Sequence, residues 1–153
     1  MPEIKLNGYL LDTSVISAFA PGRPSLSLEL ASWFKDNADD LYLSSMTVQE
    51  IQKGASKLVL VSRGESRRAS DLLEWLEKLL TDFGDKVLPI DPHVAHVAGV
   101  MEAEATSIGR NSGLAEVLIA TTAKAHDLKL LTVNLKHFLP LDVVCRNPLS
   151  EDR

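Results

Sequence analysis

The stretch that decides the fold reads Gly8-Tyr9-Leu10-Leu11-Asp12-Thr13-Ser14 and turns from apolar to polar at Asp12. Its short apolar run predicts a buried strand that ends at Asp12. Thr13 and Ser14 are plausible caps for a short helix over residues 15–19. Pro21-Gly22-Arg23-Pro24 then predicts the end of that helix and a turn.

Further apolar runs predict strands at residues 41–44, 87–90, 128–133 and 142–145. Helical spacing and start signals predict helices at residues 25–37, 47–59, 66–83, 92–108 and 114–127. Three boundaries carry explicit signals, namely a capping box from Thr47 to Glu50, an N-cap and proline at Asp91-Pro92, and a closing Gly84. Strands that alternate with helices indicate a parallel sheet covered on both faces. We expect one domain over residues 1–153, with residues 1–8 as an N-terminal extension and residues 150–153 as a tail.

The composition is that of a globular protein, with 45% apolar and 24% charged residues in a chain of 153. The single cysteine, Cys145, lies in an apolar run and is interpreted as a small buried hydrophobe in a reducing compartment. Because no apolar run reaches the length of a membrane span, we expect a cytoplasmic protein. The net charge of −5 argues against nucleic-acid binding by bulk attraction, although a metal held by carboxylates supplies local positive charge.

Three acids follow the predicted strand ends and helix starts. Asp12 directly follows the first strand, Glu50 lies in the first turn after the second, and Glu116 begins the helix before the fourth. Asn134 and His137 directly follow the fourth strand. Ligands of open α/β sheets bind at the carboxyl ends of the strands, so these residues are candidates for one site. Three carboxylates there supply the oxygen ligands that Mg²⁺ or Mn²⁺ prefers.

Each acid also has a purely structural interpretation. Asp12 could cap the helix that follows it, Glu50 fits the capping box, and Glu116 could complement a helix dipole. Whether Glu116 joins the other two depends on the path of residues 109–113. The residues alone therefore suggest a metal site without specifying one.

Four motifs resemble those of PIN-domain ribonucleases, with the VapC-like toxins of bacterial toxin–antitoxin pairs as the most similar branch. The first is Leu10 to Ser17 around Asp12, and the second is Leu43 to Ile51 around Glu50. The third is Leu114 to Ala123 around Glu116, the fourth is Leu131 to Phe138, and Asn147-Pro148-Leu149 resembles the closing Asn-Pro of the family. Together they span residues 9–149 in the order that the family has.

Three positions depart from the family pattern. Glu116 stands where an aspartate is usual, His137 stands where an acid is usual, and Ser14 stands where asparagine is common. Glu116 keeps the carboxylate but places it about 1.5 Å further out. His137 removes a negative charge, and neutral imidazole suits Mn²⁺ or Zn²⁺ better than Mg²⁺.

The resemblance implies a three-layer α/β/α fold with a mainly parallel central sheet, a homodimer and an Mg²⁺- or Mn²⁺-dependent endoribonuclease. It also implies that a small antitoxin neutralises the protein and carries it to promoter DNA, with no membrane partner. Asp12 and Glu116 are then expected to bind the metal, and Glu50 to bind it through water or orient the attacking water. Asn134 or Thr132 is expected to hydrogen-bond Asp12 or the phosphate, with His137 a phosphate contact or a turn residue.

Two other functions are compatible with the sequence. The first is a catalytically silent PIN-like module that binds RNA or a protein, which Glu116 and His137 favour. The second is a phosphoacceptor domain with a similar acidic cluster, but the chain lacks an aspartate after the third strand beside a strand-end lysine.

Overall fold

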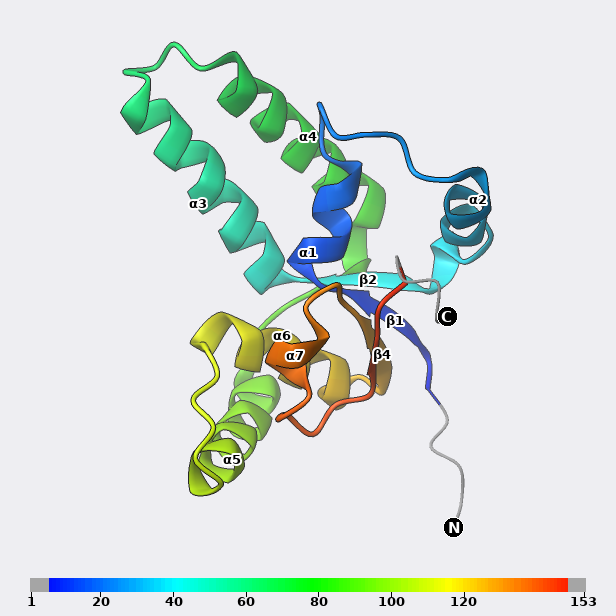
Figure 1. Cartoon of the computed structure of the whole chain (residues 1–153), viewed down its shortest axis with the longest axis vertical. Coiled ribbons are helices and arrows are strands. Elements are labelled where there is room, and N and C mark those ends of the chain that lie inside the picture. Colours follow the sequence, from blue (N-terminus) through cyan, green and yellow to red (C-terminus); the bar gives the residue numbers. More distant parts are fainter. Residues whose placement is uncertain (1–5, 149–153) are drawn as a thin grey trace.

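The computed structural model describes residues 6–148 as a five-stranded sheet between two layers of helices (Figure 1). The sheet order is β3-β2-β1-β4-β5, and every neighbouring pair is parallel. The strands are β1 (Gly8–Leu11), β2 (Leu41–Ser44), β3 (Val87–Leu88), β4 (Leu128–Leu131) and β5 (Cys145–Arg146). The predicted parallel sheet, and the three-layer fold that the resemblance implied, are confirmed.

Helices connect consecutive strands and cover both faces of the sheet. One layer holds α1 (Thr13–Ile16), α2 (Leu28–Asp36), α3 (Ser45–Val61) and α4 (Arg67–Phe83), and the other holds α5 (Pro92–Ser107), α6 (Leu114–Ala125) and α7 (Leu135–Phe138). Three single turns of 3-10 helix are η1 (Ser17–Phe19), η2 (Ala38–Asp40) and η3 (Gly84–Lys86). The antiparallel α3 and α4 project together away from the sheet in Figure 1.

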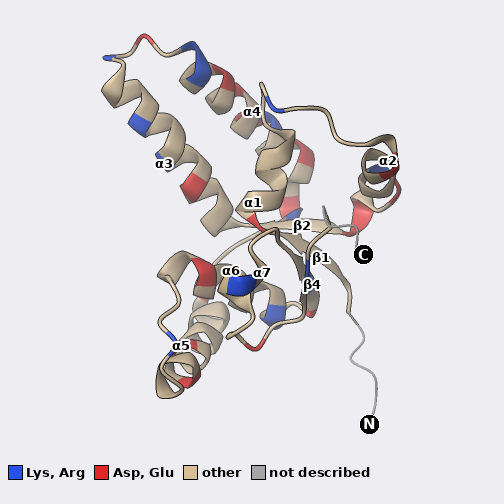
Figure 2. Cartoon of the chain, viewed as in Figure 1, with Lys and Arg blue, Asp and Glu red and all other residues tan. Residues whose placement is uncertain are grey.

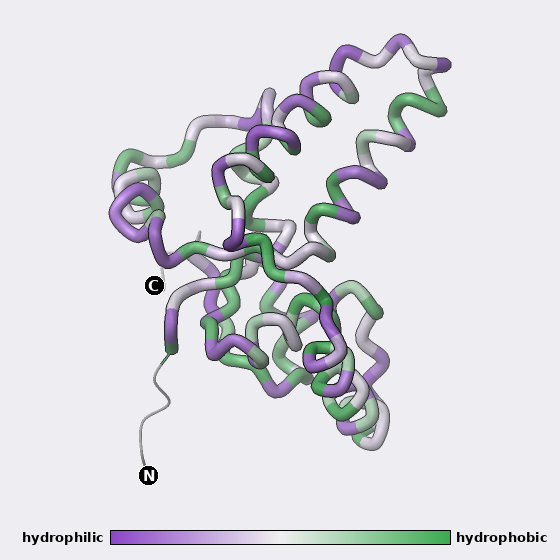
Figure 3. Tube along the Cα trace, turned by 180° about the vertical axis from the view of Figure 1, so that it is seen from behind, coloured by the Kyte–Doolittle hydropathy of each residue, from purple (hydrophilic) through white to green (hydrophobic). Residues whose placement is uncertain are grey.

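The two hydrophobic cores follow from the alternation of side chains along the central strands. Leu10 and Leu130 face α5, α6 and α7, whereas Leu11 and Leu131 face α1 to α4. Figure 3 shows hydrophobic positions concentrated on these strands and interleaved with hydrophilic ones along the helices. All four leucines are at most 1% exposed, and burial of such a side chain contributes about 1.5–3 kcal/mol.

Gly8 begins β1, as the apolar run from Gly8 to Leu11 predicts, although the expected N-terminal extension of residues 1–8 also included it. Its φ is +155°, and a Cβ at this position would lie 2.5 Å from the backbone oxygen of Asp40. A side chain at position 8 would thus collide with the segment that leads into β2. The other residues of that extension up to residue 5, and the tail at residues 150–153, lie outside the described residues.

Several boundaries differ from the predictions for identifiable reasons. β3 stops at Leu88 because Pro89 has no N–H to continue the ladder. β4 stops at Leu131, and the Val133 N–H donates to the Ser14 hydroxyl instead. β5 begins only at Cys145, after a turn in which Val143 N–H donates to the Leu141 carbonyl. Within residues 6–148, no helix combines the length and apolar character needed to cross a bilayer.

The helix caps agree with the sequence in some places and not in others. The Asp91 carboxylate accepts from the Val94 N–H at 2.9 Å with Pro92 in the first turn, and Gly84 closes α4 at φ +52°, as predicted. The capping box at Thr47 is wrong, because α3 begins two residues earlier, at Ser45, with Ser44 as its N-cap. The prediction that Thr13 and Ser14 cap the first helix is also wrong, since both lie within α1.

Candidate active site

Asp12 sits directly at the end of β1 and is 5% exposed. Its Oδ2 accepts hydrogen bonds from the hydroxyls of Ser14 at 2.6 Å and Thr132 at 2.8 Å. Asp12 occupies the N-cap position of α1, but its carboxylate makes no capping hydrogen bond. The structural interpretation as a helix cap is therefore wrong, and the side chain is held toward the end of β4 instead.

The two hydroxyls that hold Asp12 are themselves held by the backbone after β4. Val133 N–H donates to Ser14 Oγ at 3.2 Å, and Asn134 N–H donates to Thr132 Oγ1 at 3.0 Å. Thr132 is fully buried. Within residues 6–148 both hydrogen bonds to Asp12 fall on Oδ2, so Oδ1 keeps its lone pairs for another partner.

Glu50 lies in the second turn of α3 rather than at its start, because the helix begins at Ser45. Its Oε1 accepts from the Thr13 hydroxyl at 2.8 Å, and Thr13 Oγ1 lies 2.9 Å from Thr47 Oγ1. A hydroxyl has one proton to donate, so Thr47 donates to Thr13 and Thr13 donates to Glu50. This chain of hydrogen bonds, rather than a capping box, accounts for Thr47 and orients Glu50 beside Asp12.

Glu116 lies in the first turn of α6, as predicted, and its side chain is 30% exposed. Its Oε1 contacts Nδ1 of His137 at 2.6 Å, and His137 belongs to α7. The His137 side chain is 57% exposed. His137 is thus a partner of Glu116 in addition to being part of the short helix after β4.

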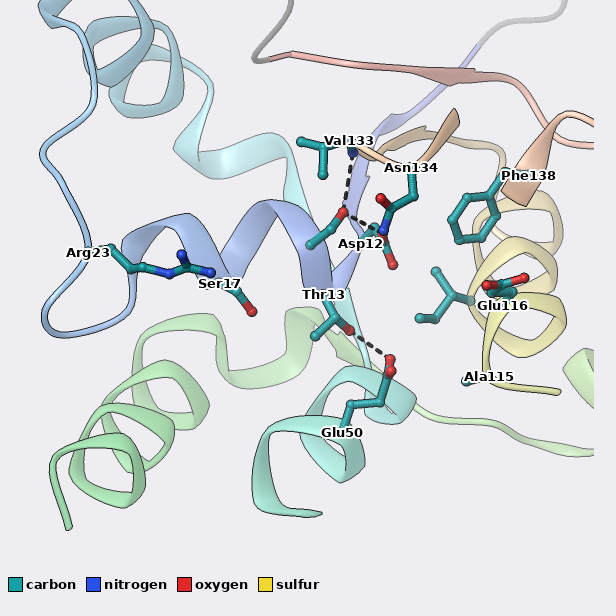
Figure 4. A pocket seen from close by; sticks show the side chains of 12 residues that line it. Asp12, Thr13, Ser17, Arg23, Glu50, Ala115, Glu116, Val133, Asn134 and Phe138 are labelled. Carbon is teal, nitrogen blue, oxygen red and sulfur yellow. Dashed lines mark hydrogen bonds between the residues drawn. The ribbon is translucent and has the colours of Figure 1, made fainter. Parts of the chain in front are cut away.

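One cavity of about 470 Å³ is lined by Asp12, Glu50, Glu116 and Asn134. Figure 4 shows these side chains arriving from the end of β1, from α3, from α6 and from the segment after β4. Arg23 reaches the same cavity from the turn after η1. Within residues 6–148, no three His, Cys, Asp or Glu side chains lie close enough together to hold a metal ion as they stand.

The family follows from this geometry and from a sequence comparison. A family model described as "PIN domain" matches residues 9–139. This chain belongs to the PIN-domain family. The match covers all four motifs, and it includes every candidate site residue that the sequence nominated.

This PIN domain matches named relatives over most of its own length and most of theirs. The chain is 33% identical over 141 residues to "Toxin FitB" of Neisseria gonorrhoeae, covering 91% of this chain and 96% of that protein. It is 32% identical over 131 residues to "Ribonuclease VapC2" of Haemophilus influenzae, covering 85% and 89%. The solved "Structure of FitAB bound to IR36 DNA fragment" matches with a TM-score of 0.77 and 31% identity, covering 93% of this chain and 96% of that one.

The structure adds residues to the site of this PIN domain that the sequence did not assign to it. No spacing pattern in the sequence marks Thr13 or Ser14 as a site residue, yet Ser14 donates a hydrogen bond to Asp12 and Thr13 donates one to Glu50. Thr47 was detectable, because Thr47, Ile51 and Ala55 recur at four-residue spacing on the buried face of α3. Arg23 gave no signal beyond its place in a turn.

Cys145 and the described part of the closing motif lie outside the lining of the cavity. Cys145 is half-buried on β5, where burial raises the pKa of its thiol and the nearby charge of Lys129 partly opposes that rise. A thiol of this kind is a poor nucleophile at neutral pH. Asn147 and Pro148 follow β5, and Leu149 of the closing motif lies outside the described residues.

Proposed function

We propose that this chain is the ribonuclease toxin of a toxin–antitoxin pair and that it hydrolyses RNA phosphodiester bonds. The observation that carries the proposal is the convergence of Asp12, Glu50 and Glu116 on one cavity at the carboxyl edge of a parallel sheet. Relatives named as a toxin and as a ribonuclease, each matched over most of its length, support the same function.

The oxygen donors that line the cavity are of the type that binds a divalent cation such as Mg²⁺ or Mn²⁺, and binding would have to draw the carboxylates closer together than they stand here. Three carboxylates give oxygen ligands and a negative charge that hard cations require. Asp12 Oδ1 is available, and the hydrogen bonds on Oδ2 fix the direction of the carboxylate. We infer that Asp12 and Glu116 bind the metal directly, and that Glu50 binds it through water.

Side chains around the acids prepare the reaction by fixing the orientation of the carboxylates. Ser14 and Thr132 hold Asp12, while Thr13 holds one oxygen of Glu50 and leaves the other to orient an attacking water. Asn134 is exposed at the cavity and can donate its amide to the RNA phosphate. A bound divalent ion would supply an activated water and neutralise charge on the phosphate.

The partners follow from the same proposal. We expect a homodimer in the cytoplasm, neutralised by a small antitoxin that reaches the cavity. Contact with promoter DNA is expected only through the antitoxin. The solved structure of FitAB bound to a DNA fragment supports the expectation that a complex of this kind contacts DNA. The RNA substrate is the one nucleic acid that we expect at the cavity itself.

Asp12→Asn is the direct test of the nuclease. The amide keeps the shape of the side chain but removes the charge, so we expect RNA cleavage to fall by at least about 100-fold with the fold retained. Cleavage ends would be mapped in total RNA after pulsed expression of wild type and variant in bacteria. Asp142→Asn is the matched control, because Asp142 pairs with Lys124 away from the cavity. Unchanged cleavage by Asp12→Asn would refute the proposal.

A silent PIN-like module is the second candidate, and the engagement of Glu116 by His137 favours it. The two functions differ in metal binding, which stabilises a native protein by mass action. For the nuclease, Mn²⁺ or Mg²⁺ at about 100 times its Kd should raise the Tm by about 5–10 °C in a chain of this size. A Tm that stays constant up to millimolar metal would favour the silent module.

A further inference from the structure

A second hollow opens beside the acidic cavity, between α1, α3 and α4. Its volume is about 210 Å³, and it shares Thr13, Ser17, Arg23 and Glu50 with the lining of the cavity. The two spaces therefore meet at the side chains that flank the proposed cleavage position. A chain of nucleotides that reaches Asp12 can continue into this hollow without leaving the surface.

Two arginines line this hollow together with Glu50, and neither forms an ion pair with a described residue. Arg23 comes from the turn after η1 and Arg68 from the first turn of α4. Among residues 6–148 the ion pairs are Arg67–Asp71, Lys124–Asp142 and His137–Glu116, so neither arginine has an acidic partner there. Figure 2 shows Lys and Arg positions on α3 and at the start of α4, within an otherwise acidic protein.

The floor of the hollow is apolar and includes an aromatic ring. Trp75 and Leu72 of α4 line it, and Trp75 is half-buried. Aromatic side chains stack with the unpaired bases of single-stranded nucleic acid, and guanidinium groups bind its phosphates. The aromatic ring and the two arginines thus line the same hollow, which lies next to the acidic cavity.

We propose that this hollow is a nucleotide subsite, in which Trp75 stacks with a base next to the cleaved bond while Arg23 and Arg68 bind the backbone phosphates. The inference rests on the proposed function and names the side on which the RNA leaves the acids. RNA therefore runs from Asp12 across the turn at Arg23 to the start of α4. Single-stranded RNA is required, because a paired base cannot reach Trp75.

A third hollow on the other side of α3 provides the internal comparison. It is lined by Glu50, Lys53 and Lys57 and also touches Ala115 of α6. Its lining holds positive charge but no aromatic ring. Lysines attract phosphate as point charges only. An RNA strand that is held by both charge and base stacking should therefore bind in the hollow with Arg23 and Trp75 rather than in this one.

The test measures RNA binding in the full chain carrying Asp12→Asn, so that the probe is not cleaved. The probe is a fluorescein-labelled single-stranded RNA of mixed sequence, read by anisotropy between 50 and 200 mM salt. We expect Arg23→Gln and Arg68→Gln each to weaken binding by about five- to tenfold. Each should also reduce the slope of log K against log salt by about 0.7.

Two further arginines serve as matched controls, since each loss also changes the net charge by one. Arg63 lies in the exposed turn between α3 and α4, and Arg67 precedes Arg68 but pairs with Asp71. Arg63→Gln and Arg67→Gln should weaken binding by less than about twofold. Equal losses for all four arginines, or a loss confined to Lys53→Gln and Lys57→Gln, would overturn the subsite.

Tryptophan fluorescence tests the stacking with each tryptophan replaced in turn by phenylalanine, which keeps an aromatic ring against the core on which both residues pack. The chain has two tryptophans, and Trp33 packs against Tyr9 and Phe34 at ring distances of 5.1 and 5.2 Å on another part of the same layer. Unlabelled RNA should quench the fluorescence of the Trp33→Phe variant, which retains Trp75. It should leave the fluorescence of the Trp75→Phe variant unchanged. Quenching confined to Trp75→Phe would refute stacking at Trp75.

Failure of this inference is distinguishable from failure of the proposed function. If the wild type cleaves RNA and the arginine variants match their controls, the nuclease stands and the subsite is refuted. If no variant cleaves RNA but Arg23 and Arg68 still dominate binding, the subsite stands in an RNA-binding module.

Discussion

Asp12 and Glu116, two acids that line the cavity, are held in opposite ways. Asp12 is buried at the end of a central strand, and two hydroxyls fixed by backbone N–H groups bind it. Glu116 stands partly exposed at the start of a helix, and its contact is a single imidazole that is itself 57% exposed. The first acid is preorganised by the sheet, whereas the second depends on one surface contact.

This difference indicates where the site tolerates change. A buried hydrogen bond to a charged group contributes about 1.5–3 kcal/mol, and its loss leaves the group unsatisfied. An exposed pair contributes little, because water replaces the partner. Two of the three departures from the family pattern, Glu116 and His137, thus fall where the site tolerates change. The third, Ser14, lies at Asp12 and still supplies a hydrogen-bond donor to that carboxylate.

Thr132→Val should have the largest effect among substitutions that spare the acids. It keeps the shape of the buried side chain but removes the donor to Asp12 and the acceptor for Asn134 N–H. We expect metal affinity and cleavage to fall by about 10- to 100-fold, measured by metal-dependent Tm shifts and by RNA cleavage.

Thr121→Val is the control for the loss of a buried hydroxyl. Thr121 is equally buried, but its hydroxyl donates only to carbonyls of its own helix, at Val117 and Leu118. Its metal affinity should match the wild type. If Thr121→Val and Thr132→Val lowered metal affinity equally, the preorganisation of Asp12 would have no functional role.

His137→Ala should have a smaller effect and the opposite sign. It releases Glu116 Oε1 from its contact, so more of the carboxylate is available to a cation. We expect metal affinity to rise by no more than about threefold, since the contact is exposed. Isothermal titration with Mn²⁺ would measure it, and a tenfold loss would indicate that His137 is itself a ligand.

Glu116→Asp should have the smallest effect on cleavage. It restores the side-chain length that is usual in the family and gives up the reach to His137, so activity should be retained or rise by up to about threefold. Initial rates on the same RNA, at saturating Mg²⁺, would measure this. A large loss would mean that the site is tuned to the longer side chain.

The sequence was sufficient for the fold because strand ends and helix starts carry local signals. Asp12 after the apolar run of β1 and the Asp91-Pro92 start of α5 needed no tertiary information. Thr47 misled the capping analysis because Ser44 offers an equivalent hydroxyl three residues earlier. Both side chains are fully buried, and only their partners distinguish them: Ser44 Oγ accepts from the Met46 N–H, whereas Thr47 Oγ1 contacts Thr13 Oγ1.

The parts of the site that the sequence missed depend on contacts between distant segments. Thr13 reaches Glu50 across 37 positions of the chain. Glu116 of α6 reaches His137 of α7 across 21 positions, after a loop at residues 109–113 whose path has no local code. The same is true of Arg23, since a turn fixes its backbone but the cavity that it enters is built by several other elements, among them α1, α3 and α6.

The close approach at Gly8 sets an evolutionary constraint far from any acid. Tyr9 and Leu10 pair with the start of β2, so the crossing of Gly8 over Asp40 fixes how deeply the first strand is seated. Four residues later the same strand delivers Asp12. Any side chain at position 8 would therefore force this segment to shift, even though Gly8 does not line the cavity that holds Asp12.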